Sequence, residues 1–324
     1  MTSPPNLPEP SSGNDRPDCK RPFGESLLRK MKDTLAPELR AALWMIGSIV
    51  SFSFMAVAGR WLAEGYDTFE IMLYRSITGI VIVFAVGAAV GTLGEITTRS
   101  AGVHVIRNVF HFGGQNLWFY SITVIPLAQV FALEFTSPIW ILVLSPIFLG
   151  EHMTRPRIVA AVLGFIGILI VTRPGATPLN AGIVTAALAA ICFALTGLLT
   201  KRLTKTESLT TILAYLTVTQ AIFGLVCAGY DGDIKLPTFE SAPLLGLVGV
   251  AGLIAHFCLT KALSIAPATV VMPIDFTRLP IIAVIGMLIF AEPLDPWVFV
   301  GAVLIFAGNY YNIWSETRKV QVSD

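Results

Sequence analysis

The sequence has little charge for its length. Asp, Glu, Lys and Arg make up 13% of the 324 residues, whereas a soluble domain carries about a quarter. Hydrophobic residues make up 54%, the mean hydropathy is +0.73, and apolar runs of about 20 residues recur. A net charge of +1 gives no sign of a nucleic-acid surface. These values exclude an ordinary soluble domain and predict a polytopic helical membrane protein.

Cysteine pairs and catalytic motifs are also missing. None of the four cysteines forms a C-x-x-C pair, and three lie inside apolar runs, which argues against a disulfide framework or a metal site. No histidine is followed by glutamate, so HExxH is absent, and so is G-x-S-x-G. We therefore expect no enzyme activity, no cofactor and no bound metal. The cysteines are Cys19, Cys192, Cys227 and Cys258.

Both ends of the chain lack apolar runs. Residues 1–38 are rich in Pro, Ser and mixed charge and have no early apolar core. This pattern is unlike a cleavable secretory signal and is typical of a disordered tail. Residues 316–324 form a second, short tail.

Windows of about 19 residues predict ten membrane spans, most of them with short connections. If the N-terminus is cytoplasmic, fifteen Lys and Arg lie in cytoplasmic segments and three at most lie outside. This bias predicts that both termini are cytoplasmic. The spans lie near residues 40–61, 69–91, 102–124, 126–149, 156–172, 179–200, 208–229, 241–263, 267–291 and 295–314.

A shift of 141 residues places the second half of the chain on the first. Span 4 then falls on span 9, and VLGFIG (162–167) falls on VLIFAG (303–308). One offset kept across five helices indicates an internal repeat with halves at 39–175 and 179–315. Because each half has five spans, the second must enter the membrane from the opposite side. We expect an all-α membrane protein of ten transmembrane helices in two inverted repeats, a design that helical transporters use around a midplane site.

The end of each half resembles a known family. A Gly-Glu or Ala-Glu step, a polar turn and a small-residue helix occur as LGEHMTRPRIVAAVLGFIGILIV (149–171) and FAEPLDPWVFVGAVLIFAGNYYN (290–312). With Arg75 in span 2 and Trp44 in span 1, these segments resemble the EamA branch of the drug/metabolite transporter superfamily. The resemblance covers about residues 40–315. It implies a carrier of a small polar metabolite (an amino acid or its derivative, a vitamin or a nucleotide derivative) in a bacterial-type inner membrane.

Six charged residues lie inside the predicted spans, where each costs at least about 2.5–3.5 kcal/mol without a partner or water. Four cations against two carboxylates leave an excess of two positive charges, which favours a cargo with a carboxylate or other anionic group. The carboxylates either pair with arginines to hold helices together, or line a central cavity and bind substrate, protons or both; we prefer the cavity. The six are Arg75, Arg107, Glu134, Lys261, Asp275 and Arg278.

A polar stripe marks one face of span 3, where His104, Asn108, His111, Gln115 and Trp118 recur at helical spacing. Span 8 carries a matching stripe of His256, Thr260 and Ser264, and the two stripes together predict a cavity wall. Because imidazole titrates near neutral pH and burial disfavours an ionised carboxylate, His111, His256 or a buried carboxylate could carry a coupling proton. We prefer Glu134, with Asp275. The predicted substrate-binding residues are Tyr74, Arg75, Arg107, His111, Gln115, Trp118, Glu134, His256, Lys261, Asp275 and Arg278.

Other features of spans 4 and 9 suggest how the halves move. Glu151 and Glu292 close these spans, and we predict that they cap the N-termini of spans 5 and 10. Prolines 138, 146, 273 and 280 predict kinks. We expect alternating access around spans 1–4 and 6–9, with spans 5 and 10 peripheral as a candidate homodimer contact. The alternative is a channel or membrane sensor on the same fold. The expected partners are a small-molecule substrate and the lipid bilayer.

Overall fold

The computed structural model describes residues 37–150, 153–174, 179–230, 232–266, 271 and 274–323, without the side chains of Leu149 and of residues 316–323. Nearly all of the predicted N-terminal tail, together with Glu151 and Pro273, lies outside the described residues. In the described part of the chain, every secondary-structure element longer than one residue is helical. The first half contains α2 (Pro37–Leu62), α3 (Thr68–Val90), η1 (Leu93–Glu95), α4 (Ala101–Val124), α5 (Leu127–Glu134), α6 (Ser137–Leu149) and α7 (Arg155–Thr172).

The second half contains α8 (Ala181–Leu203), α9 (Leu209–Ala228), α10 (Ser241–Ile265), α12 (Arg278–Phe290) and α13 (Pro296–Ser323). Within the described residues, eight helical runs are long and apolar enough to cross a membrane, with α5 and α6 counted as one run. Two of the ten predicted spans are not among these eight. Span 3 corresponds to α4, whose polar stripe lowers its hydropathy. Span 9 lies partly outside the described residues, which leaves the 13 residues of α12.

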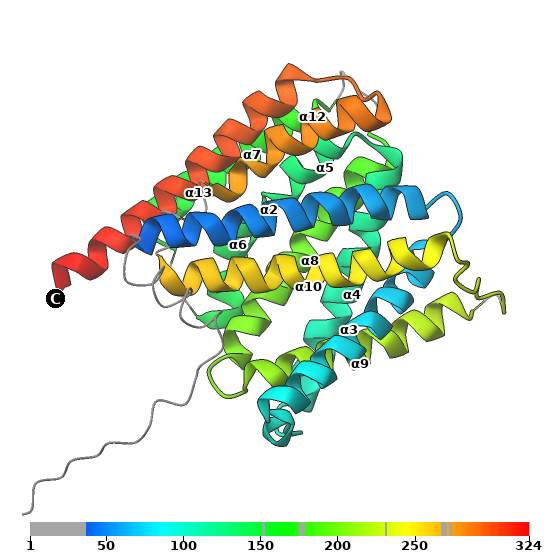
Figure 1. Cartoon of the computed structure of the whole chain (residues 1–324). Helices are drawn as coiled ribbons and strands as arrows, with labels where there is room; N and C mark the ends of the chain where they lie inside the picture. Colours follow the sequence, from blue (N-terminus) through cyan, green and yellow to red (C-terminus); the bar gives the residue numbers. More distant parts are fainter. Residues whose placement is uncertain are drawn as a thin grey trace, which may run out of the picture.

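The offset of 141 recurs in the helix bounds. Helices α3, α6 and α7 begin at residues 68, 137 and 155, and α9, α12 and α13 begin 141 residues later. The largest helix contacts follow the same rule: α2 packs on α10, and their equivalents α8 and α4 pack on each other (Figure 1). Helix α3 packs on its own equivalent α9, and α7 on its equivalent α13. This pattern is that of a two-fold relation between the halves.

Glycines let α7 and α13 approach closely. A Cβ added to Gly167 would lie 2.7 Å from the carbonyl oxygen of Gly301, and one added to Gly308 would lie 2.8 Å from that of Ala160. The contact moves back along α7 as the chain advances along α13, so these equivalent helices run antiparallel. Small residues thus permit the close approach of these two helices.

The loops between the helices repeat the two-fold relation. The hydroxyl of Tyr66 lies 2.7 Å from that of Ser241. At the equivalent positions of the opposite halves, Ser100 hydrogen-bonds to the Glu207 carboxylate, which also accepts from Thr97 at 2.7 Å. These hydroxyl donors hold the pKa of Glu207 below its ordinary value, because they stabilise the ionised form. Each pair of equivalent loops thus joins the halves.

Span 4 is not one continuous helix. Pro138 has no N–H to donate to the carbonyl of Glu134, and the hydroxyl of Ser137 donates to that carbonyl instead, at 2.7 Å. The Thr136 hydroxyl donates to the Leu133 carbonyl at 2.6 Å. The predicted kink is therefore a full break, and it places the end of α5 inside the bundle.

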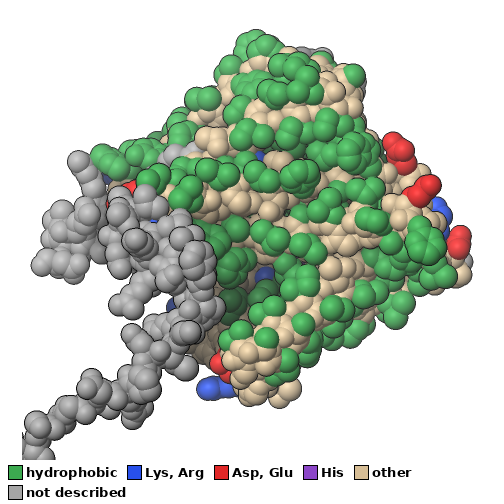
Figure 2. Space-filling model, in the orientation of Figure 1, with side chains coloured by type: hydrophobic (Ala, Val, Ile, Leu, Met, Phe, Trp, Pro, Cys, Tyr) green, Lys and Arg blue, Asp and Glu red, His purple; other side chains and the backbone are tan. Residues whose placement is uncertain are grey.

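The outer surface is largely hydrophobic. Figure 2 shows hydrophobic side chains over most of one face, with Asp and Glu gathered at one edge, and a hollow in which Lys or Arg atoms are visible. The start of α2 and the end of α13 lie at the same end of the bundle (Figure 1). An apolar outside around a charged inside is the arrangement expected in lipid.

Candidate functional site

A cavity of about 390 Å³ lies between the two halves. Nine of the eleven predicted substrate-binding residues line it: Arg75, Arg107, His111, Gln115, Trp118, Glu134, His256, Asp275 and Arg278. The remaining lining residues are Phe52, Met55, Phe119, Phe135, Ser137, Pro138, Phe193, Thr196, Gly197, Thr200 and Leu259. Both halves therefore contribute to one site.

Much of the wall consists of equivalent residues from the two halves. Under the offset of 141, six pairs of positions both line the cavity: 52 and 193, 55 and 196, 115 and 256, 118 and 259, 134 and 275, and 137 and 278. The rings of Phe135 and its equivalent Phe276 stack on each other, with centroids 4.3 Å apart. Direct contact between equivalent residues is expected only at a symmetry axis, so the cavity lies on the two-fold relation between the halves.

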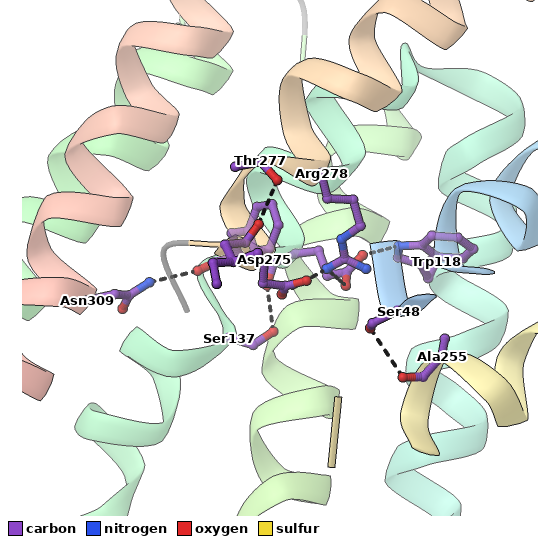
Figure 3. Close-up of polar contacts among 11 residues, drawn as sticks. Ser48, Trp118, Ser137, Ala255, Asp275, Thr277, Arg278 and Asn309 are labelled. Carbon is purple, nitrogen blue, oxygen red and sulfur yellow. Dashed lines mark hydrogen bonds and ion pairs between the residues drawn. The ribbon is translucent and has the colours of Figure 1, made fainter. Parts of the chain in front are cut away.

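Arg278 joins the two predicted carboxylates. Its Nη2 lies 3.4 Å from Oε1 of Glu134 and 3.4 Å from Oδ2 of Asp275, and its side chain is 3% exposed. Figure 3 shows the guanidinium between Asp275 and the side of the cavity that holds Trp118. A buried guanidinium is tolerated when it is paired in this way. The two carboxylates therefore both pair with an arginine and line the cavity, so the two alternatives hold for the same residues.

Aromatic rings enclose the same guanidinium. The Cζ atom of Arg278 lies 4.6 Å from the ring centroid of Phe52 and 5.0 Å from those of Phe131 and Phe135. Cation–π contacts of this kind strengthen when water is excluded. Phe131 itself is fully buried, which agrees with a packing role.

Glu134 remains accessible from the cavity. Its Oε2 accepts a hydrogen bond from the indole nitrogen of Trp118 at 2.8 Å, while its side chain is 20% exposed, against 6% for Asp275. The break after α5 presents this carboxylate to the cavity. Of the two carboxylates, Glu134 is the more exposed to the cavity.

The other two arginines have only neutral partners within the described residues. Arg107 donates to Thr200 Oγ1 at 3.0 Å and to Asn108 Oδ1 at 2.9 Å. Arg75 makes a 3.8 Å contact with the sulfur of Met72. Their charges are near His111 and His256, whose rings are 6.4 Å apart. A cationic region therefore faces the cavity beside the histidines.

Two predicted site residues lie elsewhere. The Tyr74 hydroxyl donates to the carbonyl of Lys235 at 2.7 Å, in the connection before α10. Lys261 is exposed and does not line the cavity. The prediction that these two side chains face the cavity is wrong. Tyr74 instead bonds to the loop near the start of α3, and for Lys261 the apolar surroundings in the sequence did not reveal which side of α10 faces the cavity. Without Lys261, three arginines and two carboxylates leave one excess positive charge in the cavity instead of two.

The polar stripes are only partly cavity wall. His104 stacks on the ring of Tyr215 at 4.3 Å, and Asn108 donates to the Tyr215 carbonyl at 3.0 Å. In α10, His256 lines the cavity. Thr260 does not line it, and its hydroxyl bonds to the carbonyl one turn earlier on its own helix, as such hydroxyls do. Ser264 is exposed, and its hydroxyl likewise bonds to the Lys261 carbonyl.

Glu292 caps a different helix from the one predicted. Its Oε2 accepts from the backbone N–H of Leu127 at 3.0 Å, at the start of α5, and its other oxygen pairs with Arg60. At the start of α13, Asp295 accepts from the N–H of Trp297 at 3.0 Å. The predicted cap for span 10 is therefore wrong: Glu292 ties α2 and α5 of the first half to the second half.

Several aromatic and hydroxyl residues of the cavity wall were not predicted from the sequence. Phe52 and Phe193 line it, and their match under the offset of 141 was the available signal. Thr196, Thr200 and Ser137 gave no such signal, because Thr and Ser occur in many membrane helices.

Helical halves related by an internal repeat, an apolar exterior and a charged cavity on the repeat axis define a class: polytopic membrane proteins with a shared internal binding cavity. The model of the EamA-like transporter family matches residues 39–173 and again residues 180–314. The chain belongs to the EamA-like transporter family, a part of the drug/metabolite transporter superfamily. Membership in this family, together with the relatives below, indicates a transporter and not an enzyme.

Relatives with assigned names are transporters. A protein of Rickettsia conorii named S-adenosylmethionine uptake transporter is 30% identical over 290 residues, which cover 90% of this chain and 98% of that protein. A riboflavin transporter of Brucella anthropi is 29% identical over 273 residues, covering 82% and 96%. A solved crystal structure superimposes with a TM-score of 0.60 at 15% identity, over 86% of this chain and 98% of that one, which supports the fold alone.

Proposed function

We propose that this protein is a secondary transporter that carries a small polar metabolite across a bacterial-type inner membrane by alternating access. The observation that carries the proposal is the charged cavity whose wall includes six pairs of equivalent residues from the two halves. A site on the repeat axis can open to either side when the halves exchange conformations. Relatives named for S-adenosylmethionine and riboflavin transport support a metabolite as the cargo.

The proposed topology has ten spans in two inverted repeats, residues 39–175 and 179–315, with both termini cytoplasmic. The antiparallel packing of the equivalent helices α7 and α13 supports inversion. The start of α2 and the end of α13 lie at the same end of the bundle, which supports an even number of membrane crossings. The excess of Lys and Arg in the segments assigned to the cytoplasm supports the orientation.

Glu134 is the proposed proton-coupling residue, with Asp275 as its equivalent in the second half. Both carboxylates share Arg278, so protonation of Glu134 weakens one of the two contacts that hold the guanidinium. Arg278 then shifts toward Asp275. Because the two carboxylates belong to different halves, this step changes the contact between the halves, which alternating access requires.

Purified protein in proteoliposomes will show saturable uptake with counterflow. We expect unlabelled solute inside the vesicles to accelerate entry of the same labelled solute, because a carrier returns faster when loaded. The measurement uses radiolabelled S-adenosylmethionine and radiolabelled riboflavin, each against empty vesicles. Flux that rises linearly with concentration, without acceleration by internal solute, would instead indicate a channel; no flux of either solute above that of empty vesicles would count against the transport of these two compounds.

A further inference from the structure

The cations of the cavity break the symmetry of its walls. Each of the three arginines has an uncharged equivalent in the other half, so the shared scaffold does not require them. The pairs are Arg75 with Leu216, Arg107 with Val248, and Arg278 with Ser137.

Among the described residues, carboxylates pair with only one of these cations. Arg278 contacts both Glu134 and Asp275, whereas Arg75 and Arg107 have neutral partners within the described residues. Two guanidinium groups beside one low-dielectric cavity repel each other, and an anion between them would remove that cost. The free positive charge of the cavity is therefore concentrated at Arg75 and Arg107.

Polar atoms beside these arginines also lack partners. His111 is 7% exposed, and no partner in the described chain contacts its Nδ1; Gln115 is 5% exposed, and its Oε1 is similarly unpartnered. A side pocket of about 30 Å³, room for little more than one water, is lined by Arg75, His111 and Gln220. Gln220 is 3% exposed with an unpartnered Nε2. Buried polar atoms without partners are costly unless a ligand or water satisfies them, and the amide nitrogen of Gln220 is a donor that an anion or water can satisfy.

Glycine makes room for one of the two cations. A Cβ added to Gly252 would lie 2.9 Å from Nη2 of Arg75 and 3.1 Å from its Nε. The guanidinium therefore rests against bare backbone of α10. This position is built into the packing and does not depend on a carboxylate partner.

Aromatic rings line the cavity around Arg278. Phe52, Trp118 and Phe135 lie there around Arg278 and Glu134. Arg107 and Trp118 are eleven residues apart on α4, so at 1.5 Å per residue their backbone positions are separated by about 16 Å along the helix axis. The cations without carboxylate partners therefore lie towards Arg107, and aromatic rings surround the paired Arg278 towards Trp118; Phe52, whose ring centroid is 5.2 Å from that of His256, lies between the two regions.

We propose that the substrate is an elongated organic acid whose carboxylate binds between Arg75 and Arg107, beside His111, while a planar ring lies among Phe52, Trp118 and Phe135. This assignment rests on the proposed transport function and specifies the substrate class of the same cavity. A carboxylate accepts from both guanidinium groups, and charge-assisted hydrogen bonds of this kind are strong. The ring packs on the aromatic wall, where stacking adds affinity.

The test measures ligand-induced thermal stabilisation of the purified full-length protein with matched probes. S-adenosylmethionine is compared with its decarboxylated form, and phenylalanine and methionine with their methyl esters. We expect at least one acid to bind at least about tenfold more tightly than its carboxylate-free partner, since a hydrogen bond to a charged group has this magnitude. R75Q and R107Q should each remove this preference, whereas K261Q, a cation outside the cavity, should keep it.

A second variant tests the role of Arg75 independently, in case R75Q does not fold. Gly252→Ala keeps the charge of Arg75 but displaces its guanidinium, and it should also reduce the preference for the acid. The assignment is overturned if no acid in the set stabilises the wild type, if acid and carboxylate-free forms bind equally, or if R75Q and G252A retain the preference. Counterflow of riboflavin, which has no carboxylate, would in that case leave the transport function standing; absence of all counterflow would remove both.

Discussion

Replacing Glu134 by Gln will abolish uptake driven by a pH gradient, while exchange of labelled for unlabelled solute without a gradient persists. Glutamine keeps the shape and can still accept from Trp118, but it cannot gain or lose a proton. Glu134 is the more accessible of the two cavity carboxylates, and its contact with Arg278 joins the two halves. Gradient-driven uptake should therefore fall to the level of empty vesicles, measured as accumulation with the interior held at a different pH from the exterior.

The matched control for this variant is Glu64→Gln. Glu64 is an exposed carboxylate between α2 and α3 and does not line the cavity, so its neutralisation should leave accumulation unchanged. If E134Q still accumulates solute in response to the pH gradient with normal affinity, Glu134 is not the coupling residue.

The second large effect is expected at Arg278. Replacing it by Gln leaves Glu134 and Asp275 in the cavity without their shared cation, and removal of one partner from a buried pair costs about 3–5 kcal/mol. R278Q should therefore lower the thermal midpoint of the purified protein by several degrees and abolish transport. Thermal unfolding in detergent, followed by proteoliposome uptake, measures both effects.

Neutralising a carboxylate at the same time should recover part of the lost stability. In the double variant R278Q/D275N, one fewer negative charge is left unpaired, so the two substitutions should be less than additive. Additive losses would mean that the 3.4 Å contact between Arg278 and Asp275 contributes nothing to stability. K261Q, which changes an exposed cation, should leave the midpoint unchanged.

The repeat made the centre of the site predictable. Glu134 and Asp275 are charged, lie inside apolar runs and match under one offset, and burying such groups is too costly without a purpose. Pairing of these carboxylates with arginines was one of the two expected alternatives. That Arg278 contacts both of them could not be predicted, because Ser137, the equivalent of Arg278, has no charge to suggest it. Spacing places residues on a helix, but contacts across helices need the packing.

Predictions that depended on the helix face were less successful. In a membrane the lipid-facing surface is as apolar as the core, so hydrophobic periodicity does not distinguish the two. Lys261 was therefore assigned to the cavity and lies outside it. The polar residues of α4 recur at helical spacing, yet the two nearest the N-terminus of the helix, His104 and Asn108, pack against Tyr215.

The details of the helix breaks and caps could not be predicted from the sequence either. Pro138 predicted a kink, but the full break needed Ser137 and Thr136 to satisfy the freed carbonyls. Glu292 carried a helix-capping signal, and the recipient proved to be α5, 165 residues earlier in the chain. A carboxylate at the end of a helix does not reveal which N-terminus the fold brings to it.

Accessibility of the cavity from both faces of the membrane tests the central claim most directly. The four native cysteines are replaced, and single cysteines are placed at the equivalent cavity positions Met55 and Thr196. A membrane-impermeant thiol reagent is then applied to either face of oriented vesicles. An inverted pair of halves around one shared cavity predicts that each cysteine reacts from both faces, at rates that substrate changes in opposite directions. Reaction from one face only, whatever the substrate, would contradict the account.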